Sequence, residues 1–178
     1  MLNYSGKSRL LVSDTGRRIT VHRGQKVWDP GMVIEASSLR RSGGDRSERE
    51  DWTKALLAQF RRNILGAMEG DRASEKRLEG MLLNAQRFAF QNPFVAASLS
   101  YSVARGFANV DDTSGYVLTI EGPWYSGIDF EFLRKLFGLY GDAFDYQQEY
   151  GLPDRLGPPF TLVRVDKIDL QTVQTVFP

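Results

Sequence analysis

The hydrophobic pattern of this chain changes at Asn92-Pro93, and this change limits the possible folds more than any other feature. Before it, apolar residues recur at helical spacing in two stretches, one opening at Ser47, which forms a capping box with Glu50, and one opening at about Glu75. The apolar stripes comprise Trp52, Ala55, Leu56, Phe60, Ile64 and Met68 in the first stretch and Leu78, Met81, Leu82, Ala85 and Phe88 in the second. The residue before a proline disfavours helical backbone, so Asn92-Pro93 ends the second helix. We therefore predict two amphipathic helices in the first half of the chain.

Beyond Asn92-Pro93, short strand-forming segments dominate. Residues 94–99, 115–120 and 160–165 are typical of strands, and Asp129 is placed to cap a helix that carries Phe130, Leu133, Phe137 and Tyr140. A further helical turn follows residue 99, and an N-terminal hairpin is predicted from residues 10–12 and 19–21 around Asp14-Thr15-Gly16. With helices early and strands mostly late, the sequence predicts a single α+β domain over residues 1–178.

Composition narrows the chemistry. The chain has no cysteine and one histidine, His22, which disfavours disulfides, thiol nucleophiles, zinc-thiolate sites and a Ser-His-Asp triad. Its 23 basic and 22 acidic residues nearly cancel, so no overall charge draws it to nucleic acid or anionic lipid. We find no apolar run long enough for a signal peptide or a membrane span. Carboxylates, hydroxyls and arginines remain as candidates for function.

The first candidate segment is Val21-His22-Arg23-Gly24, at the end of a predicted strand. Adjacent strand residues point to opposite faces, so only one of His22 and Arg23 can face a given cleft. An arginine there presents a planar set of donors that suits a pair of phosphates. The plainer interpretation is a solvent-facing arginine beside a turn glycine.

The second candidate segment spans residues 94–107. A strand that runs directly into a helix places Ser98, Ser100 and Ser102 at the corner, where hydroxyls can bond a carboxylate or a ribose. The plainer interpretation is helix capping by Ser100 or Ser102.

The third candidate segment spans residues 144–149. If residues 147–149 are extended, the Gln147 amide and the Glu149 carboxylate lie on the same side of the strand, just after the aromatic Phe144. An aromatic-x-x-Gln/Glu-x-Glu pattern of this kind arises by chance in roughly one chain in ten of this length.

Together, and in this order, the three segments resemble the arginine–serine–glutamate class of ADP-ribosyltransferase toxins. The family's aromatic-Arg-Gly, Phe-x-Ser-Thr-Ser and Gln/Glu-x-Glu motifs correspond to Arg23-Gly24, to residues 94–98 and to residues 147–149. The resemblance covers roughly residues 18–166 and implies a split β-sheet core with an N-terminal helical segment. One departure is serious: the first serine of the family motif, which supports the catalytic glutamate, is Ala96 here, followed by Ala97.

The resemblance implies cleavage of the nicotinamide–ribose bond of NAD, with no metal, and transfer of ADP-ribose to an acceptor. It assigns Glu149 the role of catalytic carboxylate, acting with Gln147 and Arg23. It assigns NAD binding to Arg23, Gly24, Ser98 and Ser100, with Arg23 on a phosphate.

The resemblance also bears on the acceptor. Gln147, where arginine-modifying members carry glutamate, and Phe144 imply a non-arginine acceptor. The near-neutral charge favours a protein over nucleic acid, although Arg40, Arg41 and Arg46 keep a nucleic-acid acceptor open.

Three alternatives stay open from the sequence. The first is an NAD glycohydrolase of the same fold, the second is a catalytically degenerate binding domain, and the third is an α+β interaction module without an NAD site. The toxin resemblance further implies a secreted or translocated bacterial effector that acts in the target-cell cytoplasm, released from a larger polymorphic toxin and countered by an immunity protein.

Overall fold

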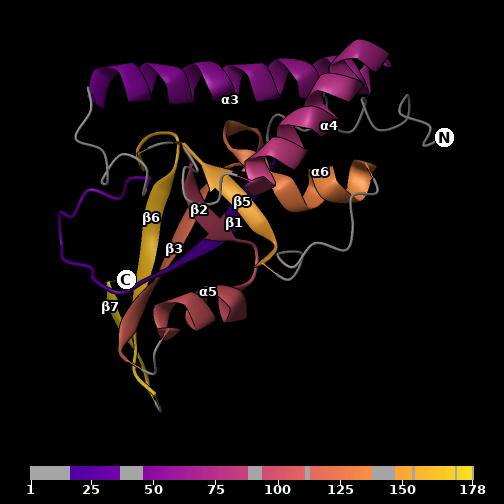
Figure 1. Ribbon diagram of the computed structural model, residues 1–178. Coiled ribbons are helices and arrows are strands. Elements are labelled where there is room, and N and C mark those ends of the chain that lie inside the picture. The colour runs from indigo at the N-terminus through magenta and orange to yellow at the C-terminus, as the bar shows by residue number, and fades with distance from the viewer. Residues whose placement is uncertain are drawn as a thin grey trace.

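The computed structural model describes residues 17–36, 46–87, 94–110, 113–137, 147–153, 155–170 and 172–177 (Figure 1). Within these ranges the chain forms a seven-stranded antiparallel sheet and four α-helices, which confirms the predicted α+β class. The strands are β1 (Arg18–Gln25), β2 (Val95–Ser98), β3 (Gly115–Pro123), β4 (Ile128–Asp129), β5 (Glu149–Leu152), β6 (Thr161–Ile168) and β7 (Val173–Phe177). The helices are α3 (Arg46–Met68), α4 (Arg72–Arg87), α5 (Tyr101–Ala108) and α6 (Phe130–Phe137), with a 3-10 turn η3 (Trp124–Ser126).

The sheet has the strand order β4-β5-β2-β1-β3-β6-β7, and its two halves are weakly joined. β1 pairs with β3 along its whole length, from Arg18 opposite Pro123 to Gln25 opposite Tyr116. By contrast, the described part of β2 pairs with β1 at one position, His22 opposite Ser98. The half formed by β4, β5 and β2 therefore meets the half formed by β1, β3, β6 and β7 at a single cross-strand pair.

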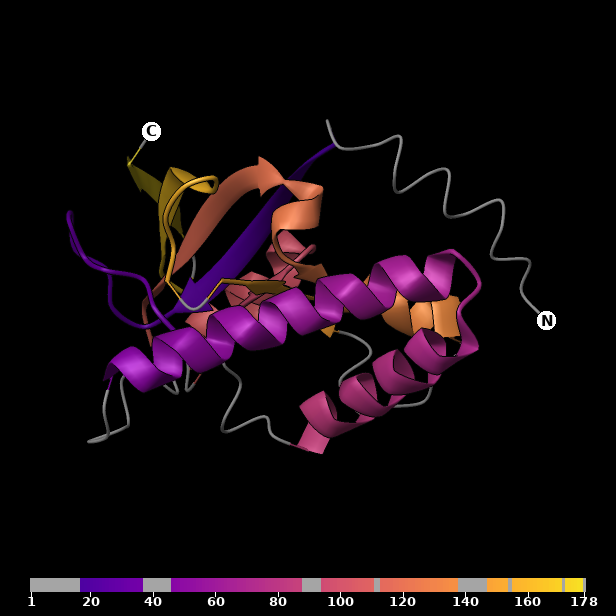
Figure 2. The ribbon, with the colours of Figure 1, turned by 90° about the horizontal axis from the view of Figure 1, so that it is seen from above.

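Helices α3 and α4 cover one end of the sheet. In Figure 1 α3 runs across the top of the molecule, and the view from above shows α4 folding back beside it (Figure 2). The Phe60 ring of α3 packs edge-on against Phe94 and Phe130, with ring centroids 6.1 and 5.9 Å apart. Leu78 and Leu82 of α4 are buried in the same core. These contacts explain the helical spacing of Phe60, Leu78 and Leu82, whereas Trp52, which the sequence placed on the same stripe as Phe60, is 55% exposed.

Helix α4 begins earlier than the sequence predicted. We expected it to open at about Glu75, but it begins at Arg72. The Asp71 carboxylate accepts hydrogen bonds from the backbone N–H groups of Ala73 and Ser74, at 3.0 and 3.1 Å, and so caps the first turn.

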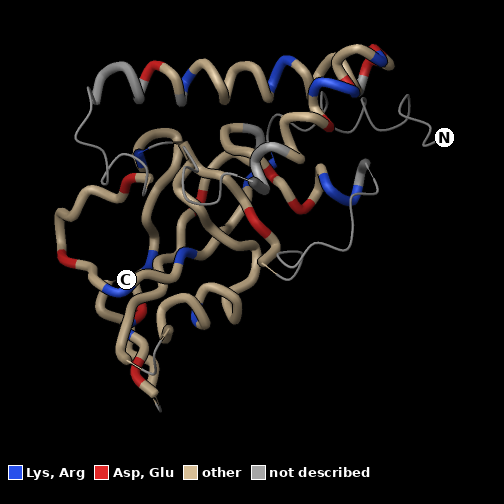
Figure 3. The backbone as a smooth tube through the Cα atoms, in the orientation of Figure 1, with Lys and Arg blue, Asp and Glu red and all other residues tan. Residues whose placement is uncertain are grey.

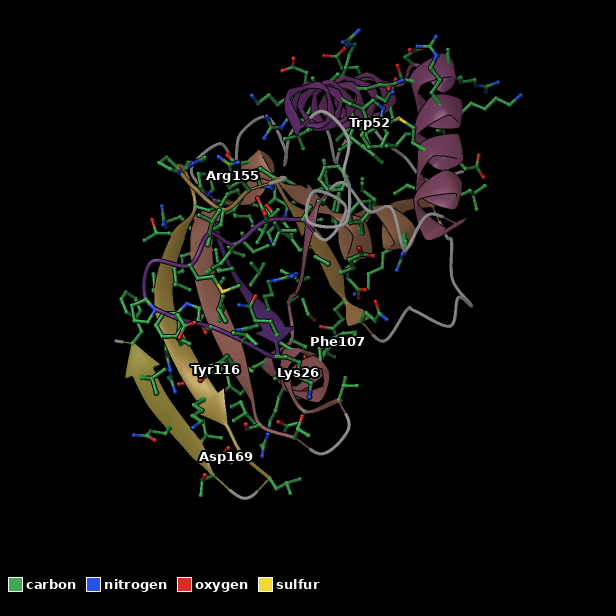
Figure 4. All side chains as sticks on the ribbon, turned by 60° about the vertical axis from the view of Figure 1, so that its left-hand side comes forward. Lys26, Trp52, Phe107, Tyr116, Arg155 and Asp169 are labelled. Carbon is green, nitrogen blue, oxygen red and sulfur yellow. The ribbon has the colours of Figure 1, made fainter. Side chains whose placement is uncertain are left out.

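Helix α5 packs directly onto the sheet, and two glycines permit this. A Cβ atom at Gly24 would lie 1.9 Å from the Ala104 carbonyl oxygen, and one at Gly115 would lie 2.0 Å from the Ala108 carbonyl oxygen. Ala104 and Ala108 are fully buried in this contact. At the end of α5, Lys26 donates hydrogen bonds to the Val110 carbonyl and the Thr113 hydroxyl, and it is seen there beside Phe107 in Figure 4.

The other predicted elements have mixed outcomes. The strands near residues 94–99, 115–120 and 160–165 are present as β2, β3 and β6, and a further strand, β7, follows β6. Asp129 caps α6 as predicted, because its carboxylate accepts from the Phe132 N–H at 2.8 Å. Residues 10–16 of the predicted hairpin, Phe88 and Tyr140 lie outside the described residues. Among the described helices, none has the length and apolar character needed to cross a membrane.

Candidate functional site

The strands that carry the predicted site residues are neighbours in the sheet. Glu149 opens β5 and lies directly opposite Ser98 of β2, which in turn lies opposite His22 of β1. The same line continues through Thr119 of β3 to Arg164 of β6. Directly paired residues of antiparallel strands present their side chains on the same face, so these five residues form one polar row across five strands.

Arg23 is the neighbour of His22 on β1, and its side chain lies on the other face of the sheet. Because neighbouring strand residues alternate, the ladder gives His22 the face of Ser98 and Glu149 and directs Arg23 to the other face. The Arg23 guanidinium donates from Nη1 to the Ala96 carbonyl at 2.7 Å and from Nε to the Gln25 side-chain oxygen at 3.1 Å. Arg23 therefore spans the junction between the two halves of the sheet, in contact with the strand that carries Ser98.

Ser98 fixes the backbone around Glu149. Its hydroxyl donates to the Gln147 carbonyl at 2.6 Å and accepts from the Ser100 N–H at 3.0 Å. A third hydrogen bond runs from the Leu99 N–H to the Gln148 carbonyl at 3.0 Å. These hydrogen bonds join the β2–α5 corner to the segment before β5. The buried Ser98 hydroxyl therefore holds residues 147 and 148 in place.

The segment before Glu149 is not extended, contrary to the condition under which we placed Gln147 beside it. Gln147 lies in a 3-10 turn, and Gln148 adopts a left-handed backbone with φ of 46°. Strand β5 begins at Glu149, so strand alternation does not set the side-chain direction of Gln147. Phe144, the predicted acceptor contact, lies outside the described residues.

Ser100 and Gly24 have structural roles. Ser100 is the N-cap of α5, where its hydroxyl accepts from the Val103 N–H at 3.4 Å and lies 2.9 Å from the Ser102 hydroxyl. This is the capping interpretation that the sequence left open. Gly24 lies beneath α5, so the absence of a side chain at this position is explained by helix packing.

The sequence interpretation missed Arg134. Its guanidinium Nη2 lies 3.6 Å from Glu149 Oε2, and the two side chains are 7% and 20% exposed. Arg134 belongs to the face of α6 that also buries Phe130 and Leu133. A charged residue at helical spacing within an apolar stripe was the signal that could have identified it.

A second polar cluster lies toward the other end of the row. The fully buried Asp166 accepts hydrogen bonds from Tyr101 (2.8 Å), Arg164 (2.8 Å) and Thr175 (2.7 Å). The Tyr101 ring packs edge-on against His22, with centroids 5.3 Å apart, and His22 Nδ1 lies 3.2 Å from the Thr119 hydroxyl. This cluster attaches the start of α5 to the sheet.

The protonation of this cluster follows from its burial. Burial raises the pKa of Asp166, but its hydrogen bonds and the Arg164 charge outweigh burial and hold the pKa below the ordinary value. Burial and the Asp166 hydrogen bond raise the pKa of Tyr101 to about 12. Burial lowers the pKa of His22 and outweighs the Asp166 carboxylate, which raises it. At neutral pH, Asp166 is therefore ionised while Tyr101 and His22 are neutral.

We predict that Asp166 makes the fold sensitive to acid. A carboxyl group whose pKa is lowered by folding stabilises the protein above its unfolded value, here 3.8, and this contribution is lost as the pH falls through the folded value. Urea unfolding between pH 2 and 6 should show the free energy of unfolding falling less steeply below about pH 4 in Asp166→Asn than in the wild type. The control Asp169→Asn changes a carboxylate at the turn between β6 and β7 (Figure 4). If both variants keep the wild-type slope, Asp166 does not act in this way.

The described residues contain no group of three or more His, Cys, Asp or Glu side chains placed to hold a metal ion. Both signs of charge are interspersed along α4, whereas the described part of α3 carries Asp51 followed by Lys54, Arg61 and Arg62 (Figure 3). Arg40 and Arg41, which kept a nucleic-acid acceptor open, lie outside the described residues.

Comparisons of the chain with protein-family models, with curated proteins and with solved structures gave no match.

Proposed function

We propose that this chain is an NAD-dependent mono-ADP-ribosyltransferase in which Glu149 is the catalytic carboxylate. The observation that carries the proposal is the adjacency of three strands, β5 with Glu149, β2 with Ser98 and β1 with Arg23. Arg23 and Glu149 are 126 positions apart in the sequence (149 − 23). The sequence grouped them with Ser98 because the three motifs occur in the order of the family. The weak junction between β1 and β2 also agrees with the split sheet that the resemblance implies.

The residues at this junction suit the chemistry of NAD. Arg23 provides a guanidinium for a phosphate, and Glu149 provides a partly exposed carboxylate for a ribose hydroxyl. Ala96 of β2, whose carbonyl accepts from Arg23, is exposed and carries only a methyl group. In this proposal, Arg23 exchanges its hydrogen bond to the Ala96 carbonyl for one to the ligand.

The reaction breaks the bond between the nicotinamide nitrogen and C1′ of the ribose. The bonding electrons leave with nicotinamide, which becomes neutral, and the positive charge that develops on the ribose resembles an oxocarbenium ion. The Glu149 carboxylate stabilises this charge and holds the 2′-hydroxyl. A nucleophile of the acceptor then bonds to C1′ and loses its proton. Because nicotinamide leaves readily, the mechanism does not need a strong general acid.

Ser98 and Gln147 position Glu149 through a hydrogen bond between them. The hydrogen bond from the Ser98 hydroxyl to the Gln147 carbonyl fixes the turn from which β5 starts. The carboxylate is therefore presented from a rigid strand end, which is the preorganisation that charge stabilisation requires. In the proposal, Gln147 favours a non-arginine acceptor, and the near-neutral net charge favours a protein as that acceptor.

The proposal is tested by following ADP-ribose to its destination. Purified wild-type protein and Glu149→Ala are incubated with NAD radiolabelled in its adenylate portion and with bacterial or eukaryotic lysate, and the label is measured in protein, nucleic acid and free ADP-ribose. We expect label in protein with the wild type and background label with the variant. Glu149-dependent label in free ADP-ribose alone would instead indicate a glycohydrolase, and label in nucleic acid would overturn the protein acceptor. NAD that stays intact with both lysates would contradict the proposed enzymatic activity. It would favour the catalytically degenerate domain suggested by Ala96.

A further inference from the structure

Glu149 needs a group that orients its carboxylate, and the serines near it are engaged elsewhere. The Ser98 hydroxyl donates its proton to the Gln147 carbonyl, and the Ser100 hydroxyl caps α5 and bonds Ser102. Ala96, on the same strand, offers a methyl group. One charged partner of Glu149 comes from another element: Arg134 of α6 lies 3.6 Å from the carboxylate.

An arginine at position 134 is energetically unfavourable because its side chain is buried. Its side chain is 7% exposed, and it lies on the helix face that buries Phe130 and Leu133. Burying a guanidinium removes much of its favourable hydration, and a protein with an apolar residue of similar volume in such a site is often equally or more stable. Within the described part of the chain, Nη1 of Arg134 is buried without a hydrogen-bond partner. Stability alone therefore gives a weak reason for an arginine here.

The pair geometry indicates how Arg134 acts on Glu149. The distance of 3.6 Å is longer than the 2.7–2.9 Å typical of a charge-assisted hydrogen bond, so the two groups interact mainly through charge. In a poorly hydrated environment such an interaction is much stronger than in water. A buried cation at this distance favours the ionised form of the carboxylate and restricts its rotamers.

We propose that Arg134 is a positioning residue that keeps Glu149 ionised and oriented for the reaction. This role rests on the proposed function, whereas the charge coupling between the two side chains can be measured without it. Within the described residues, titratable groups near the pair include His22, two strands away on the same face, and Asp129 of β4, whose carboxylate accepts from Trp124 Nε1 at 2.9 Å. Because burial lowers the pKa of His22, its ring is neutral near neutral pH and adds no charge to this face of the sheet.

The test compares three variants of α6. Arg134→Met removes the charge at similar volume, Arg134→Lys keeps it, and Lys135→Met removes the same charge one residue further on. Lys135 is the matched control because its side chain is 60% exposed and pairs with Glu131. Thermal unfolding first establishes that each variant is folded at the assay temperature.

The first measurement is the protonation of the Glu149 carboxyl group, followed by NMR on protein labelled with carbon-13 in glutamate and assigned with Glu149→Gln. The midpoint should move to higher pH by about one unit in Arg134→Met and stay near the wild-type value in Arg134→Lys and Lys135→Met. An unchanged midpoint in folded Arg134→Met would overturn the inference whether or not the protein uses NAD. If Arg134→Met fails to fold, the stability of the Arg134→Met/Glu149→Gln double variant tests the coupling. If the two charges are coupled, adding Glu149→Gln to Arg134→Met should restore stability, because it removes the carboxylate charge left without its partner.

The second measurement is the pH profile of nicotinamide release from NAD. The acid limb of the profile should move to higher pH in Arg134→Met, with a loss in kcat of about tenfold or more and partial recovery in Arg134→Lys. A wild type that leaves NAD intact would refute the proposed function. An active wild type whose profile does not change in Arg134→Met would refute the role of Arg134 alone.

Discussion

Replacing Glu149 with glutamine is expected to lower the rate of NAD cleavage by about 100-fold or more, the usual effect of removing one group that stabilises charge in a transition state. Glutamine keeps the shape of the side chain and its ability to bind a hydroxyl, but it removes the negative charge. The loss should therefore fall on kcat, with a smaller change in KM, because the charge matters most when the ribose becomes positive. Steady-state release of nicotinamide measures both constants.

Two controls separate this effect from misfolding. Glu121→Gln makes the same chemical change on β3, where Glu121 lies near the Thr20 hydroxyl at 3.5 Å, and it should leave the rate within about twofold of the wild type. Glu149→Gln alone leaves the Arg134 guanidinium buried without its partner charge, so the Arg134→Met/Glu149→Gln double variant is also measured. Folded variants at position 149 with the wild-type kcat would show that Glu149 is not catalytic.

Replacing Gly24 with alanine is expected to reduce the free energy of unfolding by about 3 kcal/mol or more. The added methyl carbon would lie 1.9 Å from the Ala104 carbonyl oxygen and 2.7 Å from the Ala108 backbone nitrogen. Both atoms belong to the backbone of α5, which cannot move aside as a flexible side chain can. The whole helix would have to lift from β1, taking the Tyr101–Asp166 hydrogen bond with it. Urea unfolding monitored by tryptophan fluorescence measures the loss.

Gly106 provides the matched control for this substitution. It lies within α5, is exposed, and has open space where a Cβ atom would be added. Gly106→Ala should therefore raise the free energy of unfolding by about 0.5–1 kcal/mol, because alanine favours helical backbone. Similar small effects for both substitutions would show that α5 is not seated on Gly24 as described.

Elements whose signals are local could be predicted from the sequence. The Asp129 cap and the strand-forming run at residues 115–120 correspond to elements that the structure contains, whereas Ser47, which we expected to cap the first helix, lies inside α3, because α3 begins at Arg46. Each signal acts over a few residues, so no knowledge of the rest of the fold is needed. The start of α4 was misplaced because Asp71 was not recognised as its cap, although that signal is local too.

The order of strands in the sheet and the partners of the site residues depend on contacts between distant segments. The sequence indicated that Ser98 lies at a strand-to-helix corner, but its partner is the Gln147 carbonyl, 49 residues away. The sequence placed Gln147 beside Glu149 on the condition that residues 147–149 are extended, but Gln148 has a left-handed backbone, in the turn that this hydrogen bond fixes. The pairing of Arg134 with Glu149 was missed because the two residues are distant from each other's local sequence signals. The packing of α6 against β5 brings them together.

The account rests most directly on whether the chain breaks the nicotinamide–ribose bond. Purified wild-type protein is incubated with NAD in the presence of bacterial and, separately, eukaryotic lysate, and free nicotinamide is quantified by chromatography beside the ADP-ribosyl product. The account predicts nicotinamide and ADP-ribosyl product in equal amounts, with Glu149→Gln reducing both by about 100-fold or more. NAD that remains intact with both lysates, or nicotinamide release that is the same in wild type and Glu149→Gln, would contradict it.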